Sequence, residues 1–189
     1  MKRLFLTMKK NNFSLLTPHS SLSLTSLNAH EKISKSDSRI ELRGRLDSLN
    51  AQIILFQAAS NNPEFINDLE EIRNVIIRLQ ACEACEKVFD EILILWGLDE
   101  NEIHERSHNP RKFFNKGHLL LNYKMGREAS EINFLRTLTR EVELCACRTF
   151  NDEDKYKIIH VLNRLSSALY ILIYKYIPED FNVDVEKIF

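Results

Sequence analysis

The chain has 189 residues, of which 44% are hydrophobic and 28% are charged, and this composition is sufficient for one globular domain with a sizeable core. A formal net charge of −1 excludes a general electrostatic attraction to nucleic acid or to an anionic membrane, so any anion site must be local. With only four glycines and four prolines, and no apolar run of about eighteen residues, the sequence favours an all-α protein of long helices without a membrane span.

Residues 1–37 are predicted to form an amino-terminal arm. They mix Lys, Asn, Ser and Thr with scattered Leu and Phe, and they have no sustained helical or strand period. Their basic start superficially suggests a signal peptide, but polar residues interrupt the apolar run and no small-residue cleavage site follows. We therefore expect a cytoplasmic protein in which residues 38–189 form one helical domain.

The first long helix is expected to begin after Asp37 or Ser38, where the apolar residues become periodic along RIELRGRLDSLNAQIILFQAAS. Asp47 lies among apolar neighbours on this helix, and a carboxylate that borders a core requires a cation. An exposed Asp47 on the solvent side fits the same period equally well.

The second long helix is expected to begin at Asn62-Pro63, a cap residue followed by proline at the first helical position. No breaker follows until Gly97, so the helix is expected to continue to Trp96. A helix of about thirty residues would extend roughly 45 Å.

Cys82 and Cys85 stand one turn apart on this expected helix, and such a pair can supply two ligands to a tetrahedral metal ion or form a redox pair. Two thiols do not complete a metal site. Further ligands would have to come from His104, His108, His118, Cys145 or Cys147. Buried free thiols are the favoured interpretation.

A short helix is expected at Glu100–Glu105, followed by a connection rich in His, Arg, Lys and Phe. The histidines at 104 and 108 have a spacing that suits metal binding, although Asn109-Pro110 disfavours helix at the second of them. The apolar residues of the connection either line a ligand pocket or pack beneath the loop; they are Phe113, Phe114, Leu119, Leu120 and Leu121.

The third long helix is expected from near residues 125–130 to about Phe150, and it carries Arg136, Arg140 and Glu143 on one face beside apolar residues. Two arginines one turn apart repel each other unless an anion lies between them, and Glu143 can neutralise only part of that charge. The helix therefore carries either an anion site or a solvated face with an Arg-Glu pair.

The fourth long helix is expected over Glu153–Ile177, where Pro178 stops it. Asn163 and Arg164 interrupt its apolar run, and the following Ser166-Ser167 pair lets another backbone approach.

Three separated motifs resemble those of the PduO-type ATP:corrinoid adenosyltransferases. RIELRGRLDSLNAQI resembles the family's glycine and Leu-Asp-x-Leu-Asn motif, residues 135–143 match A-R-T-x-x-R-x-x-E with Leu135 in place of the alanine, and residues 162–166 match L-N-R-L-S. The segment GLDENEIHERSHNPRKFFNKGH, followed by NFLRTLTREVELCA, is most similar to the ethanolamine-utilisation branch, the EutT-like proteins.

The resemblance implies a five-helix bundle, commonly a homotrimer, in which ATP and the corrinoid meet between subunits. It implies transfer of the adenosyl group of ATP to cob(I)alamin, which yields adenosylcobalamin and triphosphate, with Mg²⁺ accompanying the nucleotide. It also implies a role in ethanolamine utilisation and association with a bacterial microcompartment. The partner would be a reductase or an adenosylcobalamin-dependent enzyme.

The resemblance also assigns roles to residues. Asp47, Arg136 and Arg140 would be catalytic, with Asp47 paired to Arg136 across the subunit interface. The ATP-binding residues would be Arg140, Glu143, Asn163 and Arg164. The corrinoid pocket would contain Phe113, Phe114, Leu119 and Leu120.

The chain departs from the family pattern in two places. It has no equivalent of the glycine-rich T-K-x-G-D-x-G-x-T nucleotide loop. The H-x11-C-C-x-x-C metal motif retains only Cys82 and Cys85, with Leu69 and Ala81 at the other two positions, so protein-bound zinc or iron is not expected. The missing loop leaves a non-catalytic bundle that binds or delivers corrinoid as the alternative function, and a purely structural helical scaffold as a third.

Overall fold

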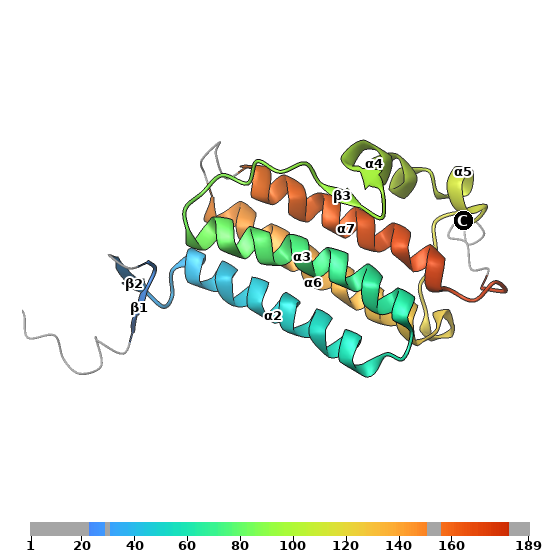
Figure 1. The fold of residues 1–189 in the computed structure, drawn as a ribbon, viewed down its shortest axis with the longest axis horizontal. Helices are drawn as coiled ribbons and strands as arrows, with labels where there is room; N and C mark the ends of the chain where they lie inside the picture. The colour runs from blue at the N-terminus through green and yellow to red at the C-terminus, as the bar shows by residue number, and fades with distance from the viewer. Residues whose placement is uncertain (1–22, 29–30, 151–155, 182–189) are drawn as a thin grey trace, which may run out of the picture.

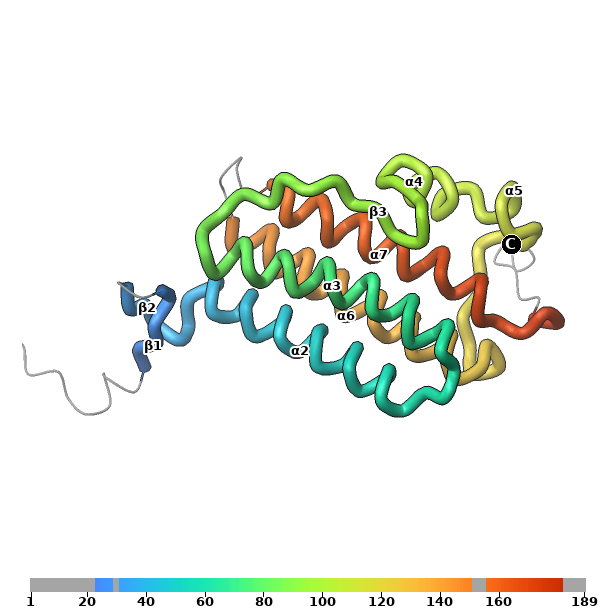
Figure 2. The backbone as a smooth tube through the Cα atoms, viewed as in Figure 1, coloured from blue at the N-terminus to red at the C-terminus, as the bar shows by residue number. Residues whose placement is uncertain are grey.

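The computed structural model describes residues 23–28, 31–150 and 156–181, most of which form a bundle of long helices (Figures 1 and 2). The long helices are α2 (Ser38–Ala59), α3 (Pro63–Ala84), α6 (Arg127–Thr149) and α7 (Tyr156–Tyr176). Helix α6 packs between α2 and α7, α3 packs on α2, and the shorter α4 (Glu100–His108) packs on α7. These five helices confirm the expected all-α five-helix bundle; α5 (Pro110–Phe114) and a 3₁₀ turn (Tyr123–Met125) complete the helical structure of the described ranges.

Local signals begin the first two helices where they were expected. Asp37 caps α2 by accepting a hydrogen bond from the Arg39 N–H at 2.9 Å. Asn62 caps α3 by accepting from the Glu64 N–H at 3.1 Å. On each helix one apolar stripe is then buried in the common core, as in Leu42, Leu46, Leu49 and Ile53 of α2.

Helix α3 ends at Ala84, so the prediction of a continuous helix to Trp96 is wrong. Glu86 adopts φ +55°, and the Lys87 N–H returns to the Cys82 carbonyl oxygen at 2.9 Å, a geometry that closes the helix with a left-handed residue. After the turn at Cys85 and Glu86 the chain continues to Leu93 without regular secondary structure; residues 85–93 are here called the strap, which runs back along the bundle (Figure 2).

The strap and the strand that follows it bury only some of their apolar side chains. Phe89, Leu93 and Leu95 are buried, whereas Ile92 and Ile94 are 76% and 58% exposed. A short apolar run of this kind does not distinguish extended chain from helix by its period alone, which explains the wrong prediction. Gly97 serves a tight turn between β3 (Ile94–Leu95) and β4 (Leu98–Asp99), where its φ of +77° follows the +52° of Trp96.

Two further expectations differ from the structure. Helix α4 begins at Glu100 behind a capping box of Asp99 and Glu102, and it extends past Glu105 to His108, because Pro110 restricts the backbone of Asn109 and not that of His108. The arm contains a small antiparallel hairpin of β1 (Leu24–Ser26) and β2 (Lys32–Ser34), too short to give a strand period. Residues 1–22, the expected helix start at Glu153 and the last residues, 182–189, lie outside the described residues.

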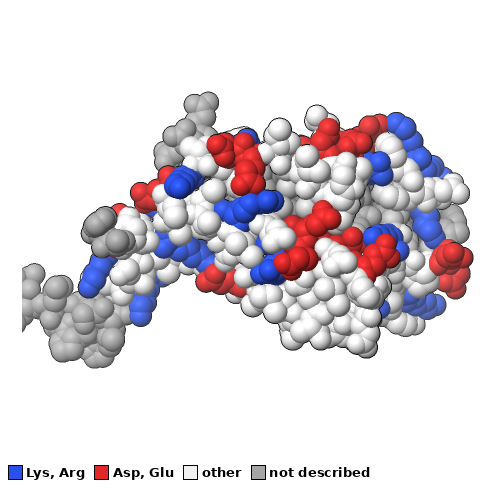
Figure 3. Space-filling view, viewed as in Figure 1, with Lys and Arg blue, Asp and Glu red and all other residues white. Residues whose placement is uncertain are grey.

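The surface in the orientation of Figure 3 mixes both signs of charge, with a broad uncharged area over the carboxyl-terminal half of α2. Ile54 and Leu55 of that half are 46% and 57% exposed. Within the described ranges, none of the helices combines the length and hydropathy needed to cross a bilayer.

A buried carboxylate links α3 to α2 at the end of the bundle that lies next to the β1–β2 hairpin. Glu83 of α3 is 1% exposed and pairs with Arg39, at 2.9 Å, and with Arg43, both on α2. Arg43 also donates to the Leu27 carbonyl oxygen beside β1. One carboxylate therefore holds α3, α2 and the base of the arm together.

We predict that Glu83→Gln lowers the free energy of unfolding by about 2–3 kcal/mol, because two partly buried guanidinium groups lose their counter-charge. The control is Glu86→Gln, since Glu86 is 49% exposed and pairs with Arg39 at 3.0 Å; this change should cost no more than about 1 kcal/mol. Urea unfolding followed by circular dichroism measures both. Equal losses would contradict the role given to Glu83.

Candidate functional site

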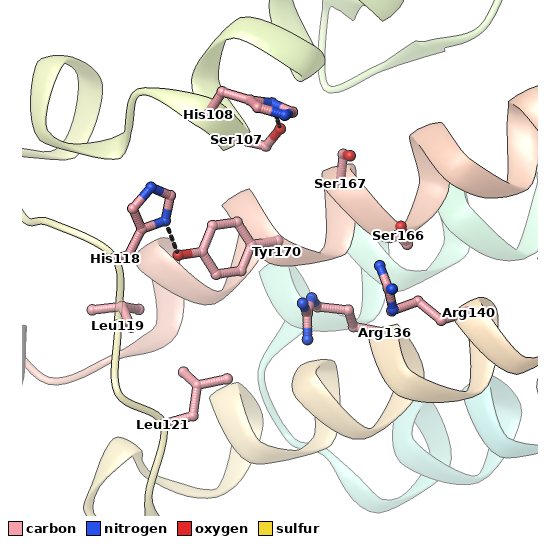
Figure 4. A pocket seen from close by; sticks show the side chains of 10 residues that line it. All are labelled: Ser107, His108, His118, Leu119, Leu121, Arg136, Arg140, Ser166, Ser167 and Tyr170. Carbon is pink, nitrogen blue, oxygen red and sulfur yellow. Dashed lines mark hydrogen bonds between the residues drawn. The ribbon is translucent and has the colours of Figure 1, made fainter. Parts of the chain in front are cut away.

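A pocket of about 530 Å³ opens where α6, α7, the end of α4 and the loop after α5 meet (Figure 4). Its volume is in the range of small-molecule sites. It is lined by Ser107 and His108 of α4, His118, Leu119 and Leu121 of the loop, Arg136 and Arg140 of α6, and Ser166, Ser167 and Tyr170 of α7. The two arginines of the third predicted helix therefore face a cavity.

Arg136 is half-buried, with its guanidinium carbon 5.4 Å from the centre of the Tyr170 ring. Burial and then the positive charge of Arg140 lower the pKa of Arg136 below its ordinary value, although an arginine stays protonated at neutral pH. Among the described residues no carboxylate lies within salt-bridge distance of either arginine. The pair is therefore a positive site that an anionic ligand would stabilise.

Glu143 and Asn163 come together one turn beyond the pocket. The Asn163 side-chain amide donates to the Glu143 carboxylate at 2.9 Å, which links α6 to α7. Glu143 thus orients Asn163 and does not neutralise Arg140. The two predicted nucleotide-binding residues are adjacent in space, at the edge of the arginine face.

Arg164 points toward α4, where it donates to Nδ1 of His104 at 2.7 Å. Burial, then the charges of Arg164 and His108, lower the pKa of His104. The His104 ring also lies 4.1 Å from that of His108. Arg164 therefore helps to hold α4 on α7 and does not line the pocket.

Asp47 is exposed on α2 and accepts a hydrogen bond from the Gln80 side chain at 2.6 Å. Within one chain it has no contact with Arg136, which faces α7. The expected pairing of these two residues across a subunit interface stays a prediction.

Of the four residues expected at the corrinoid, Leu119 lines the pocket and the others do not. Phe114 stacks on Tyr174 with ring centres 4.5 Å apart, and Phe113 lies beneath the cations of Arg106 and Lys112. Leu120 is 42% exposed. For Phe114 the alternative interpretation is therefore correct: its side chain packs under the loop and does not line the pocket.

The residues at the metal-motif positions do not fit a protein-bound ion. Leu69 is buried in the core and Ala81 offers no donor atom, which leaves two thiols. In the described part of the chain, no group of three His, Cys, Asp or Glu side chains could hold a metal. Cys82 is partly buried and Cys85 is exposed, so the favoured interpretation of two buried thiols is wrong for Cys85.

Several polar pocket residues were not predicted to contact a substrate: Ser107 and Tyr170 had no predicted role, and His108 and His118 were considered only as metal ligands. Tyr170 sits in an apolar helix where its period marks it as core, and the loop around His118 has no period. On that side of α7 there was one indication in the sequence: the small Ser166 and Ser167 side chains let another backbone approach the helix.

Comparison with solved structures defines the fold class. The chain aligns with a PduO-type ATP:corrinoid adenosyltransferase from Lactobacillus reuteri, a variant complexed with cobalamin and ATP, with a TM-score of 0.62 and 19% identity over 85% of this chain and 92% of that one. A second variant of that enzyme with the same ligands aligns with a TM-score of 0.61 and 18% identity, over 90% of this chain and 99% of that one. At such identities the likeness establishes the fold alone.

The sequence defines the family. A family model described as cobalamin adenosyltransferase matches residues 22–176, and the chain belongs to this family. The corrinoid adenosyltransferases EutT of Salmonella typhimurium LT2 and Escherichia coli K12 are 33% and 31% identical over 153 residues. These alignments cover 79% of this chain and 57% of each relative, so the chain spans little more than half the length of the curated relatives it matches. The resemblance found in the three motifs is confirmed.

We predict that tripolyphosphate, a compact polyanion, binds the arginine face and raises the melting temperature at low salt. Arg140→Ala should weaken this binding about 10- to 100-fold, the loss expected for a charge-assisted contact. Arg148→Ala is the matched control, because Arg148 lies on the same helix, is 59% exposed and, among the described residues, has only a long 3.9 Å ion pair with Glu41. Calorimetry measures the affinities, and equal losses in the two variants would contradict the assignment.

Proposed function

We propose that this protein transfers the adenosyl group of ATP to reduced cobalamin, forming adenosylcobalamin and triphosphate. The observation that carries the proposal is the pair Arg136 and Arg140, two cations without a carboxylate partner among the described residues, at the wall of a pocket of suitable size. Family membership and the nearby Glu143–Asn163 pair support it.

The reaction needs stabilisation of a leaving group more than it needs an acid or base. The cobalt(I) electron pair attacks the ribose 5′ carbon, the bond from that carbon to the triphosphate oxygen breaks, and the triphosphate departs with the bonding electrons. The developing negative charge is best stabilised by fixed cations in a partly dry site. Arg140 would contact the triphosphate, and Mg²⁺ carried in with ATP would share the charge.

Arg136 is a less direct candidate because its guanidinium is already held on Tyr170. Glu143 would orient the Asn163 amide toward the nucleoside, since the carboxylate holds one amide hydrogen and leaves the carbonyl oxygen available. Arg164 would act through α4, by holding His104 and hence the helix that contributes Ser107 and His108 to the pocket.

We further propose that the site is shared between copies of this chain, as a homotrimer with Asp47 of one subunit paired to Arg136 of the next. Asp47 is exposed on α2, the helix whose carboxyl-terminal half shows Ile54 and Leu55 to solvent. Phe134 and Leu144 of α6 are also exposed, at 46% and 57%. Burial of these side chains in an assembly would bring α2 of one copy toward α6 of another.

The proposed setting is ethanolamine utilisation in the cytoplasm, with microcompartment association and with a cobalt reductase or an adenosylcobalamin-dependent enzyme as partner. The EutT relatives support this setting. Leu119 would contact the corrinoid from the loop.

The test is an anaerobic assay with chemically reduced cobalamin, ATP and Mg²⁺, in which adenosylcobalamin is followed by its absorbance. Wild-type protein should make the product, and Arg140→Ala should lose about 100-fold or more in kcat/KM, because one oriented cation is removed from the leaving group. Arg148→Ala should keep the wild-type rate. Tight cobalamin binding without product would instead select the corrinoid-binding or delivery function, and binding of neither ligand would select a structural scaffold.

We predict that inactive Asp47→Ala and Arg136→Ala chains regain activity when they are co-expressed, because a shared interface in a mixed oligomer can receive one intact residue from each chain. Gln80→Ala is the control for Asp47, since it removes the Gln80 hydrogen bond and leaves the carboxylate in place. Activity and mass by light scattering are measured on the same samples. Failure of the mixed oligomers to recover would exclude the intersubunit pair.

A further inference from the structure

A chain of three hydrogen bonds runs from the protein interior to the pocket. The Tyr174 hydroxyl donates to the Gly117 carbonyl oxygen at 2.9 Å. The Tyr170 and Tyr174 oxygens are 2.9 Å apart, and Nδ1 of His118 is 3.0 Å from the Tyr170 oxygen. The ring of His118 also lies nearly parallel to that of Tyr170, at 18°.

Proton accounting assigns a direction to each of these three bonds. A carbonyl oxygen can only accept, so the single proton of Tyr174 is committed to Gly117. The Tyr170 hydroxyl must then donate to Tyr174, which leaves the Tyr170 oxygen as an acceptor. His118 therefore donates from Nδ1, and its neutral ring is the Nδ1–H tautomer.

In this tautomer the second nitrogen, Nε2, carries a lone pair. It lies on the side of the ring away from Tyr170 (Figure 4) and has no hydrogen-bond partner within the described ranges. His118 lines both the arginine pocket and an adjoining hollow of about 480 Å³. The ring that carries this acceptor thus borders the space in which a ligand would lie.

The other polar groups of the pocket differ in what they offer to a ligand. Arg136 and Arg140 have only donors. The Ser107 hydroxyl donates to the His104 carbonyl oxygen at 2.9 Å, and the Ser166 hydroxyl donates to the Asn163 carbonyl oxygen at 2.8 Å. His108 resembles His118, because its Nδ1–H donates to the His104 carbonyl oxygen at 2.9 Å and so leaves Nε2 as an acceptor.

We propose that His118 accepts a hydrogen bond from the bound ligand through Nε2, and that Tyr170 and Tyr174 are positioning residues that hold it in the accepting tautomer. The pocket then has an anion-binding end at α6 and an acceptor end at the loop. The ligand class is a molecule with N–H or O–H donors: the amine or hydroxyls of the nucleoside, or an amide of the corrinoid side chains. The choice of these ligands rests on the proposed function.

The first test does not depend on activity. With ¹⁵N-labelled imidazole rings at about pH 8, where a free histidine is neutral, His118 should show protonated Nδ1 and bare Nε2. Tyr174→Phe removes the acceptor for the Tyr170 proton, so Tyr170 can turn and donate to Nδ1. His118 should then shift toward the Nε2–H tautomer, although the substituted residue does not line the pocket. A wild-type ring with Nε2–H, or no change in Tyr174→Phe, would overturn the proposal.

The second test uses amide side chains that imitate one ring nitrogen each. His118→Asn keeps a donor near the Nδ1 position and lacks the Nε2 acceptor, whereas His118→Gln can place an oxygen near the Nε2 position. His118→Asn should raise one KM about 10-fold, the size of a lost hydrogen bond, and His118→Gln should recover most of it. A rise in the KM for ATP identifies the nucleoside as the donor, and a rise in the KM for cobalamin identifies the corrinoid amides.

Unchanged values for both substrates in His118→Asn would refute the acceptor role. A wild-type protein without adenosyl transfer would refute the proposed function instead. In that case calorimetry measures the affinity of the same variants for ATP and for cobalamin separately. A lower affinity in His118→Asn and a recovered affinity in His118→Gln remain the expected result.

Discussion

The site depends on how one arginine is held. Arg136 lies half-buried against the face of Tyr170, one turn from Arg140, and both burial and the neighbouring charge disfavour its cationic form. A solvated helix face would have let these side chains spread apart. The close packing of α6 on α7 prevents this, because it fixes the Tyr170 ring under the guanidinium. The bundle core thus maintains a local concentration of positive charge in a chain whose net charge is −1.

Tyr170 connects the two ends of the pocket. Its ring face packs against Arg136, and its hydroxyl oxygen accepts a hydrogen bond from Nδ1–H of His118. The same side chain therefore takes part in holding both a cation and an acceptor, on opposite sides of the cavity (Figure 4). Such an arrangement suits a ligand that is anionic at one end and carries hydrogen-bond donors elsewhere, as nucleoside triphosphates do.

The long helices were predictable because their apolar residues recur at a helical period and because Asp37 and Asn62 are strong caps. The strap and β3 were not, since residues 85–95 continue the apolar run of α3 and only the left-handed Glu86 shows where the helix ends. At the site, Arg136 and Arg140 follow from charge at helical spacing. His118 and Tyr170 do not, because their roles depend on a hydrogen bond between residues 52 positions apart, which no local pattern encodes.

The strap divides the chain into two parts of different character. Every residue that lines the arginine pocket lies between Ser107 and Tyr170, after the strap, whereas α2 and α3 before it contribute none. Within one chain the part after the strap thus lines the pocket, whereas α2 and α3 support it and, in the proposed trimer, α2 presents Asp47 to a neighbouring subunit. Substitutions that alter the chemistry of the cavity can accumulate in a single contiguous stretch while the opposite wall stays the same, so ligand preference can diverge within this fold without redesign of its core.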